Sequence, residues 1–433
     1  MKKWFLMVLM LLPTLALAED KLDTGDTAWM MVSTALVLLM TPAGLALFYG
    51  GMTRSKNLLN TYSMVFVGFT VAFIMWVVAG YSIAFGATDG VLQNVIGGFS
   101  NVMLSGISWT DLSGTYPTFV FIVFQGTFAA ITVAIASGSV IERMKFSTWV
   151  AFTAIWVVLV YAPVTHMVWG GDGALLFDLG ALDFAGGTVV HMNGGLAGLV
   201  LAFMVGKRKG YPAIPMKPMS VMLTALGAAL LWFGWYGFNG GSAFGANAIA
   251  GVAFLTTTIA AAVAAITWLM IEWFMFKTPT LLGAASGVVA GLVAITPAAG
   301  FVDVTGAFII GIVGSLIGFF GVAVLKKKLG YDDSLDAFGI HFLAGLWGAI
   351  ATGIFAVNDQ DLLWDGPLKE SGDRMGQIIV QFESVFIVGA FTLVGTVIVY
   401  LIASAITGGG RVDEESESRG LDEAVHGENG LNL

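Results

Sequence analysis

Long uninterrupted apolar stretches constrain the fold of this chain more than any other feature of its sequence. Hydrophobic residues make up 57% of the 433 residues and charged residues only 11%, whereas soluble domains carry roughly a quarter charged residues. A helix needs about 20 apolar residues to cross a bilayer, and such stretches lie at 27–49, 61–85, 117–138, 146–168, 186–206, 217–236, 248–274, 280–297, 304–325, 336–356 and 376–405. The sequence therefore predicts an all-α polytopic membrane protein with eleven transmembrane helices and excludes a soluble domain.

The first eighteen residues have the pattern of a cleaved signal peptide. Lys2 and Lys3 precede an apolar run that is short for a span, and the run ends in Ala16-Leu17-Ala18, a small-x-small cleavage site. We expect residues 1–18 to be removed, which leaves the mature N-terminus at Glu19 outside the cytoplasm. A short basic signal of this kind is typical of bacteria, so we expect the chain to lie in the bacterial cytoplasmic (inner) membrane.

The basic residues indicate the orientation of the helices. When the eleven stretches are threaded from an outside N-terminus, fourteen of the nineteen Lys and Arg residues fall in the cytoplasm, in agreement with the positive-inside rule. They are Arg54, Lys56, Arg143, Lys145, Lys207, Arg208, Lys209, Lys217, Lys277, Lys326, Lys327, Lys328, Arg411 and Arg419. The sequence thus predicts an odd number of spans, with the N-terminus outside and the C-terminus inside.

The end of the chain differs in composition from everything before it. Residues 407–433 lack apolar runs and hold seven acidic residues against Arg411 and Arg419, a net charge of 2 − 7 = −5. Such segments are typically solvated and disordered. We expect a transmembrane domain over 19–406 and a cytoplasmic C-terminal tail over 407–433.

Two histidines lie inside predicted spans, where ionisable side chains are costly and mark functional sites by default. His191 and His341 begin the same local pattern, His-x3-Gly-x2-Gly, and each follows an aspartate, Asp183 or Asp336. The spacing places each histidine and its glycines on one helical face. Matching patterns five spans apart predict two inverted five-helix repeats plus a C-terminal helix, with the two histidines close to the interface between the repeats.

Two other interpretations of these histidines stay open. Each histidine could separately hydrogen-bond a neighbouring helix as a structural contact. A zinc site would need further ligands beyond two histidines, and the absence of cysteine excludes thiolate ligands, disulfides and thiol catalysis.

Aromatic residues form a second group at similar depth near the outer ends of three spans. They are Phe124 and Phe128 early in the third span, Trp169 at the end of the fourth, and Trp235 and Phe238 at the end of the sixth, followed by Ser242. Taken singly, the tryptophans fit an interfacial belt and the phenylalanines fit packing. Taken together, the group offers aromatic faces for a small cation, a hydroxyl acceptor, and apolar rings that would resist the passage of water.

Several longer motifs resemble those of the ammonium transporter family. They are FQGTFAAITVAIASGSVIER, HMVWGG followed by GALDFAGGTVVHMNGG, WFGWYGFNGGSA and DAFGIHFLAG, and the match spans essentially the whole mature chain. The resemblance implies a homotrimer with one pore in each subunit and eleven spans. It also implies transport of ammonium or ammonia, and of methylammonium, across the lipid membrane.

The resemblance also implies roles for individual residues. Trp169, Phe128 and Ser242 match the outer ammonium recruitment site, which Asp183 supports without contacting the ion. Phe128 and Phe238 match the stacked phenyl gate, with Phe124 and Trp235 adjacent to it, and His191 and His341 match the paired pore histidines. The resemblance implies no catalytic residue, cofactor, metal or nucleic acid.

The tail segment GLDEAVHGENG resembles the part of bacterial family members that docks PII-class nitrogen-signalling proteins. We expect His426 in this segment to be an exposed residue without a role in the pore. Three alternatives to transport stay open: a channel for water or small neutral solutes, an ammonium sensor, and an intramembrane enzyme. A neutral-solute channel would not need the cation site at Trp169, and no nucleophile and base are paired near either histidine.

Overall fold

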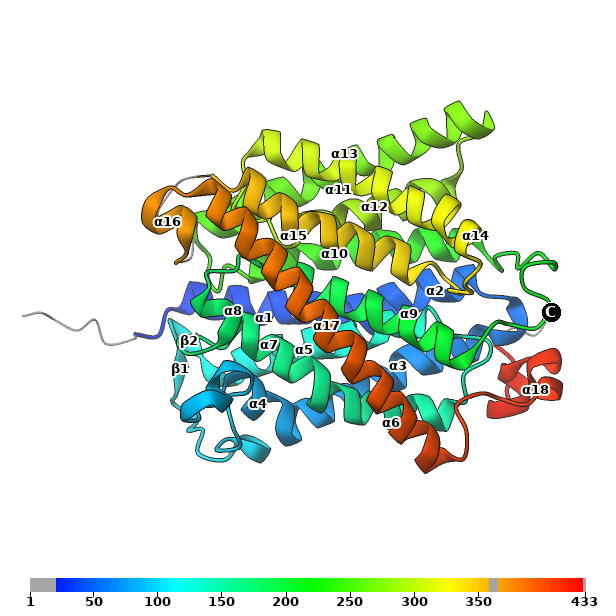
Figure 1. Ribbon diagram of the computed structural model, residues 1–433, viewed down its shortest axis with the longest axis horizontal. Helices are drawn as coiled ribbons and strands as arrows, with labels where there is room; N and C mark the ends of the chain where they lie inside the picture. Colours follow the sequence, from blue (N-terminus) through cyan, green and yellow to red (C-terminus); the bar gives the residue numbers. More distant parts are fainter. Residues whose placement is uncertain (1–20, 358–364, 431–433) are drawn as a thin grey trace, which may run out of the picture.

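The computed structural model describes residues 21–357 and 365–430, which form a bundle in which most long helices run along one common direction and α17 (Arg374–Thr407) crosses them obliquely (Figure 1). The predicted signal peptide, 1–18, lies outside the described residues. One short hairpin, β1 (Leu112–Ser113) with β2 (Tyr116–Pro117), lies at one end of the bundle with α8 (Leu175–Asp178) and α16 (Pro367–Ser371). The acidic tail lies at the opposite end, which we call the tail end.

Ten helical segments in the described part of the chain are long and apolar enough to cross a membrane. They are Thr24–Met52 (α1, η1, α2), Ser55–Phe85 (η2, α3, η3, α4), Thr118–Ser137 (α5), Phe146–Trp169 (α6, η6, α7), Gly187–Val205 (η7, α9), Val221–Gly241 (α10), Ala248–Phe276 (α11), Val304–Leu329 (α13, η8, α14), Phe338–Phe355 (η9, α15) and Arg374–Thr407 (α17). Each coincides with one predicted stretch. The remaining stretch, 280–297, forms α12 (Leu281–Ile295), which is apolar but shorter than the others.

Both pore histidine candidates lie in π-helical turns at the start of a long helix. His191 lies in η7 (Gly187–Met192), which continues as α9 (Asn193–Val205), and His341 lies in η9 (Phe338–Leu343), which continues as α15 (Ala344–Phe355). A π-helical turn leaves one extra residue in the helical ladder and is frequent at functional sites. The two turns contact each other inside the bundle.

The glycines that follow each histidine allow these two helices to pack closely. A Cβ atom at Gly195 would lie 2.5 Å from the backbone nitrogen of Phe342, and one at Gly345 would lie 3.2 Å from the Cβ atom of His191. Small residues at such contacts are the usual means by which membrane helices approach each other. The glycine spacing in the sequence therefore correctly predicted the packing face of each helix.

The acidic tail is folded against the bundle, so the expectation of a disordered tail is wrong. After α18 (Glu414–Arg419), the carboxylate of Asp422 in η10 (Asp422–His426) accepts hydrogen bonds from the backbone nitrogens of Leu59 (3.0 Å) and Asn60 (2.8 Å). These two nitrogens lie in the first turn of α3 (Leu58–Met75), where backbone N–H groups have no partner within the helix and attract anions. One of the acidic residues that suggested disorder, Asp422, thus caps a helix.

His426 is also placed differently from the expectation that it is exposed. It is half-buried, its Nε2 lies 2.9 Å from the side-chain nitrogen of Asn60, and its ring packs edge-on against Phe146 at 5.0 Å. Sequence alone could not show this, because the partners lie more than 250 residues away along the chain.

A buried network of charges connects the loops at the tail end. Arg208 binds Asp332 at 2.7 Å and Glu142 at 3.1 Å, and Arg54 binds Glu142 at 2.7 Å. Burial by itself would raise the pKa of Glu142, but the charge of Arg208 and the hydrogen bonds from Arg54 outweigh burial and lower the pKa to about 2. The network therefore stays charged at neutral pH and fixes the loops beside the tail.

Candidate functional site

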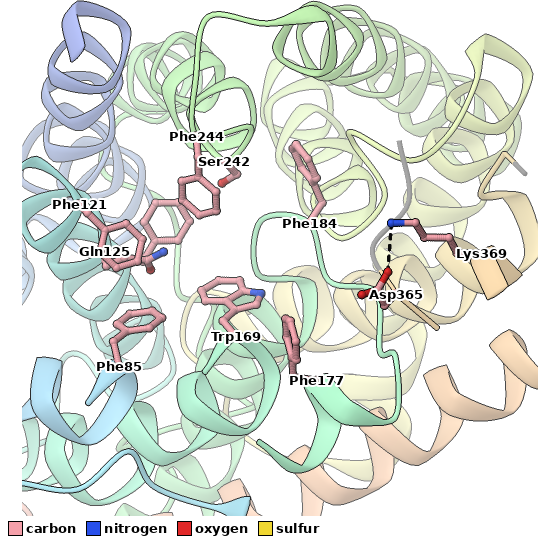
Figure 2. Close-up of a pocket in the computed structure, with 11 residues that line it drawn as sticks. Phe85, Phe121, Gln125, Trp169, Phe177, Phe184, Ser242, Phe244, Asp365 and Lys369 are labelled. Atoms are coloured by element: carbon pink, nitrogen blue, oxygen red, sulfur yellow. Dashed lines mark ion pairs between the residues drawn. The ribbon is translucent and has the colours of Figure 1, made fainter. Parts of the chain in front are cut away.

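An aromatic cavity opens at the end of the bundle opposite the tail. Its volume is about 450 Å³, and Figure 2 shows Trp169, Phe177 and Phe184 among the aromatic side chains around it. It is lined by Phe85, Phe121, Gln125, Phe128, Trp169, Phe177, Phe184, Ser242, Phe244, Asp365 and Lys369. Three of the predicted recruitment residues, Trp169, Phe128 and Ser242, thus line one cavity.

Trp169 is held in the wall of this cavity by its indole N–H. The residue ends α7 (Ala162–Trp169), and its Nε1 donates a hydrogen bond to the backbone oxygen of Asp183 at 2.8 Å. The ring meets Phe128 edge-on, with centroids 6.2 Å apart and an interplanar angle of 79°. Because the N–H is occupied, the aromatic faces of Trp169 are what remains for a ligand.

Ser242 and Gln125 supply the polar groups that are buried beside these rings. The Ser242 hydroxyl donates to the backbone oxygen of Phe238 at 2.8 Å, so its oxygen remains able to accept. The side-chain oxygen of Gln125 is buried and has no hydrogen-bond partner among the described residues. Gln125 was not predicted as a site residue; its position between Phe124 and Phe128 on α5 (Thr118–Ser137) was the available signal.

Stacked phenyl rings close the inner side of the cavity. Phe128 and Phe238 are parallel to within 23°, with centroids 4.2 Å apart, and Phe124 packs against Phe128 at 4.8 Å. All three side chains are buried. A hydrated ion therefore meets two packed apolar rings directly below the polar groups.

His191 and His341 lie beyond this pair of rings and contact each other. Their rings are parallel to within 20° at 5.4 Å, and the two Nδ1 atoms are 3.3 Å apart. The His191 ring is also 5.7 Å from Phe238 and has no partner at Nε2 among the described residues. The alternative in which each histidine bonds a separate helix does not match these contacts.

Trp235 covers one face of His191. The rings stack at 5.2 Å with an angle of 19°, and the Trp235 Nε1 donates to the hydroxyl of Thr296 at 2.9 Å. Its side chain is 1% exposed, so the interpretation of Trp235 as an interfacial belt residue is wrong. The described residues contain no group of three or more His, Asp or Glu side chains that could hold a metal ion.

Asp183 lies directly behind the site and organises the histidine turn. Its carboxylate accepts hydrogen bonds from the backbone nitrogens of Gly186, Gly187, Thr188 and Val189 and from the Thr188 hydroxyl. These are the unpaired donors at the start of η7. Asp183 therefore fixes both the turn that carries His191 and, through its backbone oxygen, the indole of Trp169.

The second histidine turn has a corresponding aspartate, but it is Asp333 and not Asp336. The carboxylate of Asp333 accepts from the backbone nitrogen of Phe338 at 2.8 Å, whereas Asp336 forms an ion pair with Lys326 at 2.7 Å. Asp183 and Asp333 each precede their histidine by eight residues, so the spacing in the sequence contained the correct match. Choosing the nearer aspartate caused the error.

Comparison with known proteins agrees with this geometry over nearly the whole chain. Residues 28–431 match the model of the Ammonium Transporter Family. The chain is 48% identical over 420 residues to an ammonium transporter of Aquifex aeolicus, with 96% of this chain and 95% of that protein covered. The chain belongs to the ammonium transporter family. An ammonium transporter of Bacillus subtilis, another member, is 46% identical over 94% of this chain and 98% of its own length.

Two solved structures show the same fold as this chain. The crystal structure of Saccharomyces cerevisiae Mep2 superposes with a TM-score of 0.82 at 33% identity and covers 91% of this chain and 89% of its own. A sensor Amt protein superposes with a TM-score of 0.84 at 29% identity and covers 93% of this chain and 98% of its own. This family member is therefore a multi-pass helical membrane protein whose relatives include named transporters and one named sensor.

Proposed function

We propose that this protein recruits ammonium at the aromatic cavity, deprotonates it at the phenyl pair and conducts ammonia through the histidine-lined pore while the histidines relay the proton. The observation that carries the proposal is the sequence of environments along one path: the Trp169 wall, the Phe128 and Phe238 rings, and then the paired imidazoles. Family membership supports ammonium as the substrate. Methylammonium, which differs by one methyl group, is expected to follow the same route.

The cavity suits a small cation because two kinds of interaction are available at once. The face of Trp169 attracts a cation through its quadrupole, an interaction worth roughly 0.5–2 kcal/mol. The oxygens of Ser242 and Gln125 can accept hydrogen bonds, which ammonium can donate and potassium or sodium cannot. Selectivity therefore arises from hydrogen-bond donation, since size alone separates ammonium poorly from potassium.

The phenyl pair makes deprotonation favourable. A bare ammonium ion would lose its hydration between Phe128 and Phe238, and an isolated charge in an apolar environment is very costly. Ammonia carries no such penalty. His191 and His341 suit the relay because each imidazole can accept a proton at one nitrogen and donate at the other.

We further propose the arrangement of the chain in the membrane. Residues 1–18 are a cleaved signal peptide, 19–406 form eleven spans as two inverted five-helix repeats plus α17, and 407–433 form a cytoplasmic tail. The charge threading supports an outside N-terminus and an inside C-terminus in a bacterial inner membrane. The functional unit is a homotrimer, and the protein is a transporter and not an enzyme.

The tail is proposed to dock a PII-class signalling protein. Its buried residues bind the bundle, whereas Glu414, Glu415 and Glu423 are exposed, with Glu414 and Glu423 in surface ion pairs with Lys209 and Arg419 that a basic partner could replace. Replacing these three glutamates with lysine leaves the Asp422 cap intact, and we expect it to abolish recruitment of a PII protein to membranes. Unchanged recruitment by this variant would exclude the tail surface as the docking site.

A sensor is the second candidate function, because the chain superposes well on a sensor Amt protein. The deciding experiment measures current across a solid-supported membrane that carries proteoliposomes of the purified protein after an ammonium pulse. The variants are Trp169→Ala and His191→Ala/His341→Ala, and Trp109→Ala is the matched control because Trp109 is 88% exposed. Sodium and potassium pulses test selectivity.

We expect an ammonium-specific current that persists in Trp109→Ala, falls in Trp169→Ala and vanishes in the histidine double variant. Uptake of ammonia without current would show that neutral ammonia passes alone and would contradict the proton relay. Folded protein that gives neither current nor uptake would contradict transport and favour the sensor.

A further inference from the structure

The outer cavity is much larger than an ammonium ion needs. Its volume is about 450 Å³, whereas one water molecule, which is similar in size to ammonium, occupies roughly 30 Å³ in the liquid. Cavities of about 300–1,000 Å³ that are lined mostly by apolar and aromatic side chains, with a few polar groups, are typical of sites for organic ligands. The proposed recruitment site therefore occupies only part of this cavity.

Trp169 lies between two groups of lining residues in Figure 2. The group on the side of the polar acceptors consists of Phe85, Phe121, Gln125 and Phe244. The group on the other side, which we call the far compartment, consists of Phe177, Phe184, Asp365 and Lys369. One continuous cavity thus joins a cation site to a second compartment that is rich in aromatic side chains.

The rings on the acceptor side pack against one another. Phe121 contacts Phe85 at 5.0 Å and Phe244 at 5.8 Å between ring centroids, and Phe244 contacts Phe124 at 6.3 Å. A cation bound beside the acceptors is therefore enclosed by rings on that side. A larger ligand extends past Trp169 into the far compartment.

Contacts behind the far compartment fix its walls. Phe184 is buried, and its ring meets Phe301 edge-on at 5.3 Å. The segment between Phe177 and Phe184 is bound through Gly180, whose backbone oxygen accepts a hydrogen bond from the side-chain nitrogen of Gln377 at 2.9 Å. The two aromatic walls are therefore preformed, and a ligand binds them without the entropic cost of ordering a loop.

The rim of the far compartment carries no net charge, because Asp365 and Lys369 form an ion pair at 3.1 Å. Such a compartment suits the apolar part of a ligand whose charge is bound elsewhere. We propose that the cavity binds primary alkylammonium ions longer than methylammonium, with the charged group at Trp169 and the alkyl chain against Phe177 and Phe184, and that these ions block the entrance. The position of the charged group rests on the proposed function.

A bound alkyl chain prevents passage because its contacts are made only in the cavity. Phe128 and Phe238 stack with centroids 4.2 Å apart below the acceptors, and an ion that moves between them leaves the far compartment. Stabilisation of the bound state that is lost in the next step raises the barrier to that step. Longer alkylammonium ions are therefore inhibitors of the ammonium current and not substrates.

A series of methyl-, ethyl-, propyl- and butylammonium chloride tests the far compartment without any substitution. Isothermal titration calorimetry of the full chain in lipid nanodiscs measures binding, with empty nanodiscs as the control for partition into lipid. Burial of one methylene group tightens binding by up to about fourfold, so we expect each added methylene to lower the Kd about two- to fourfold. Butylammonium that binds no more tightly than methylammonium would overturn the inference.

The location of the alkyl chain is tested by Phe177→Ala. We expect the ratio of the methylammonium Kd to the butylammonium Kd to fall about threefold or more, while the methylammonium Kd stays within about twofold. Phe99→Ala is the matched control, because Phe99 is 66% exposed in the loop between η4 (Gly90–Asn94) and η5 (Val102–Leu104). Trp169→Ala is expected to weaken binding of the whole series by a similar factor. An unchanged ratio in Phe177→Ala would contradict binding in the far compartment.

Inhibition of the ammonium current in proteoliposomes by the same series separates this proposal from the proposed function. Binding that tightens with chain length in a protein that gives no ammonium current would support the far compartment and contradict transport. An ammonium current that butylammonium inhibits no better than methylammonium does would support transport and contradict the far compartment.

Discussion

The two histidine turns share one plan but use their aspartates differently. Asp183 and Asp333 are both buried, and both accept a hydrogen bond from the backbone nitrogen five residues later, that of Thr188 or of Phe338. Each also precedes its histidine by the same number of residues. The correspondence extends to the π-helical turn that follows.

The difference between the turns lies in how many hydrogen bonds each carboxylate receives. Asp183 receives five, including one from the Thr188 hydroxyl. The residue at the position of Thr188 in the second turn is Phe338, which has no hydroxyl, and one oxygen of Asp333 has no hydrogen-bond partner among the described residues. Both oxygens of Asp183 therefore accept hydrogen bonds from its turn, whereas only one oxygen of Asp333 accepts a hydrogen bond.

The first prediction concerns the turn that depends most on its carboxylate. In Asp183→Asn the new amide N–H₂ would face backbone N–H groups that are buried and already need an acceptor. We expect a loss of about 3 kcal/mol or more in the free energy of unfolding, and a fall in ammonium current of roughly tenfold or more, because the Trp169 wall would shift. Thermal unfolding of the detergent-solubilised protein and current measurements check both effects. A folded variant with normal current would show that the carboxylate is not needed.

The second prediction applies the same substitution to the other turn. Asp333→Asn can keep the hydrogen bond from Phe338 through its amide oxygen and place the amide nitrogen where the partnerless oxygen now lies. We expect a loss of about 1 kcal/mol or less in the free energy of unfolding, measured beside Asp183→Asn under the same conditions. Equal losses in the two variants would remove the distinction between the turns.

The third prediction makes the first turn resemble the second. Thr188→Val keeps the side-chain shape and removes the hydroxyl that Asp183 accepts, which we expect to lower the free energy of unfolding by about 1 kcal/mol. In the double variant with Asp183→Asn the two losses should not add, because both act on the same carboxylate. Additive losses in this double-mutant cycle would show that Thr188 acts through other contacts.

The fourth and smallest effect concerns the loops beside the second turn, where Asp332 joins the Arg208 and Glu142 network. The folded pKa of Glu142 is about 2 and lies below its ordinary value of 4.5, so its stabilisation is present above pH 4.5 and is lost as the pH falls through the folded pKa. We therefore expect the difference in unfolding midpoint between the wild type and Glu142→Gln to be the same at about pH 8 and pH 5. A difference in unfolding midpoint that is already smaller at pH 6 than at pH 8 would mean that the network does not keep Glu142 charged in the folded protein.

The helical fold and much of the candidate site could be predicted from the sequence because the signals are local. Apolar stretches located every spanning segment of the structure, and the glycine spacing located the faces on which the helices of His191 and His341 pack. Aromatic residues at matching depth indicated the cavity that Trp169 and Phe128 line. The apolar stretches and the glycine spacing are patterns within single spans, whereas the aromatic group combines residues from three spans.

The features that sequence missed depend on contacts between distant segments. Asp422 caps α3 across more than 360 residues, and the tail therefore appeared only as an acidic run. The burial of Trp235 against His191 required the packing of two separate helices. Gln125 was passed over because a single amide in an apolar stretch does not show which side chains surround it.

The contact between the two imidazoles has a consequence for turnover. With the Nδ1 atoms 3.3 Å apart, a neutral pair holds one proton between them, so one ring donates and the other accepts. In the proposed relay, each proton that passes would exchange these roles and leave the pair oriented against the next proton. Trp235 stacks on one face of the His191 ring and hinders its rotation, whereas the pair can accept the next proton in the same direction only after its rings reorient. In such a relay the pair would keep the orientation that the last proton left, and the time needed for the rings to reorient would set an upper limit on the transport rate.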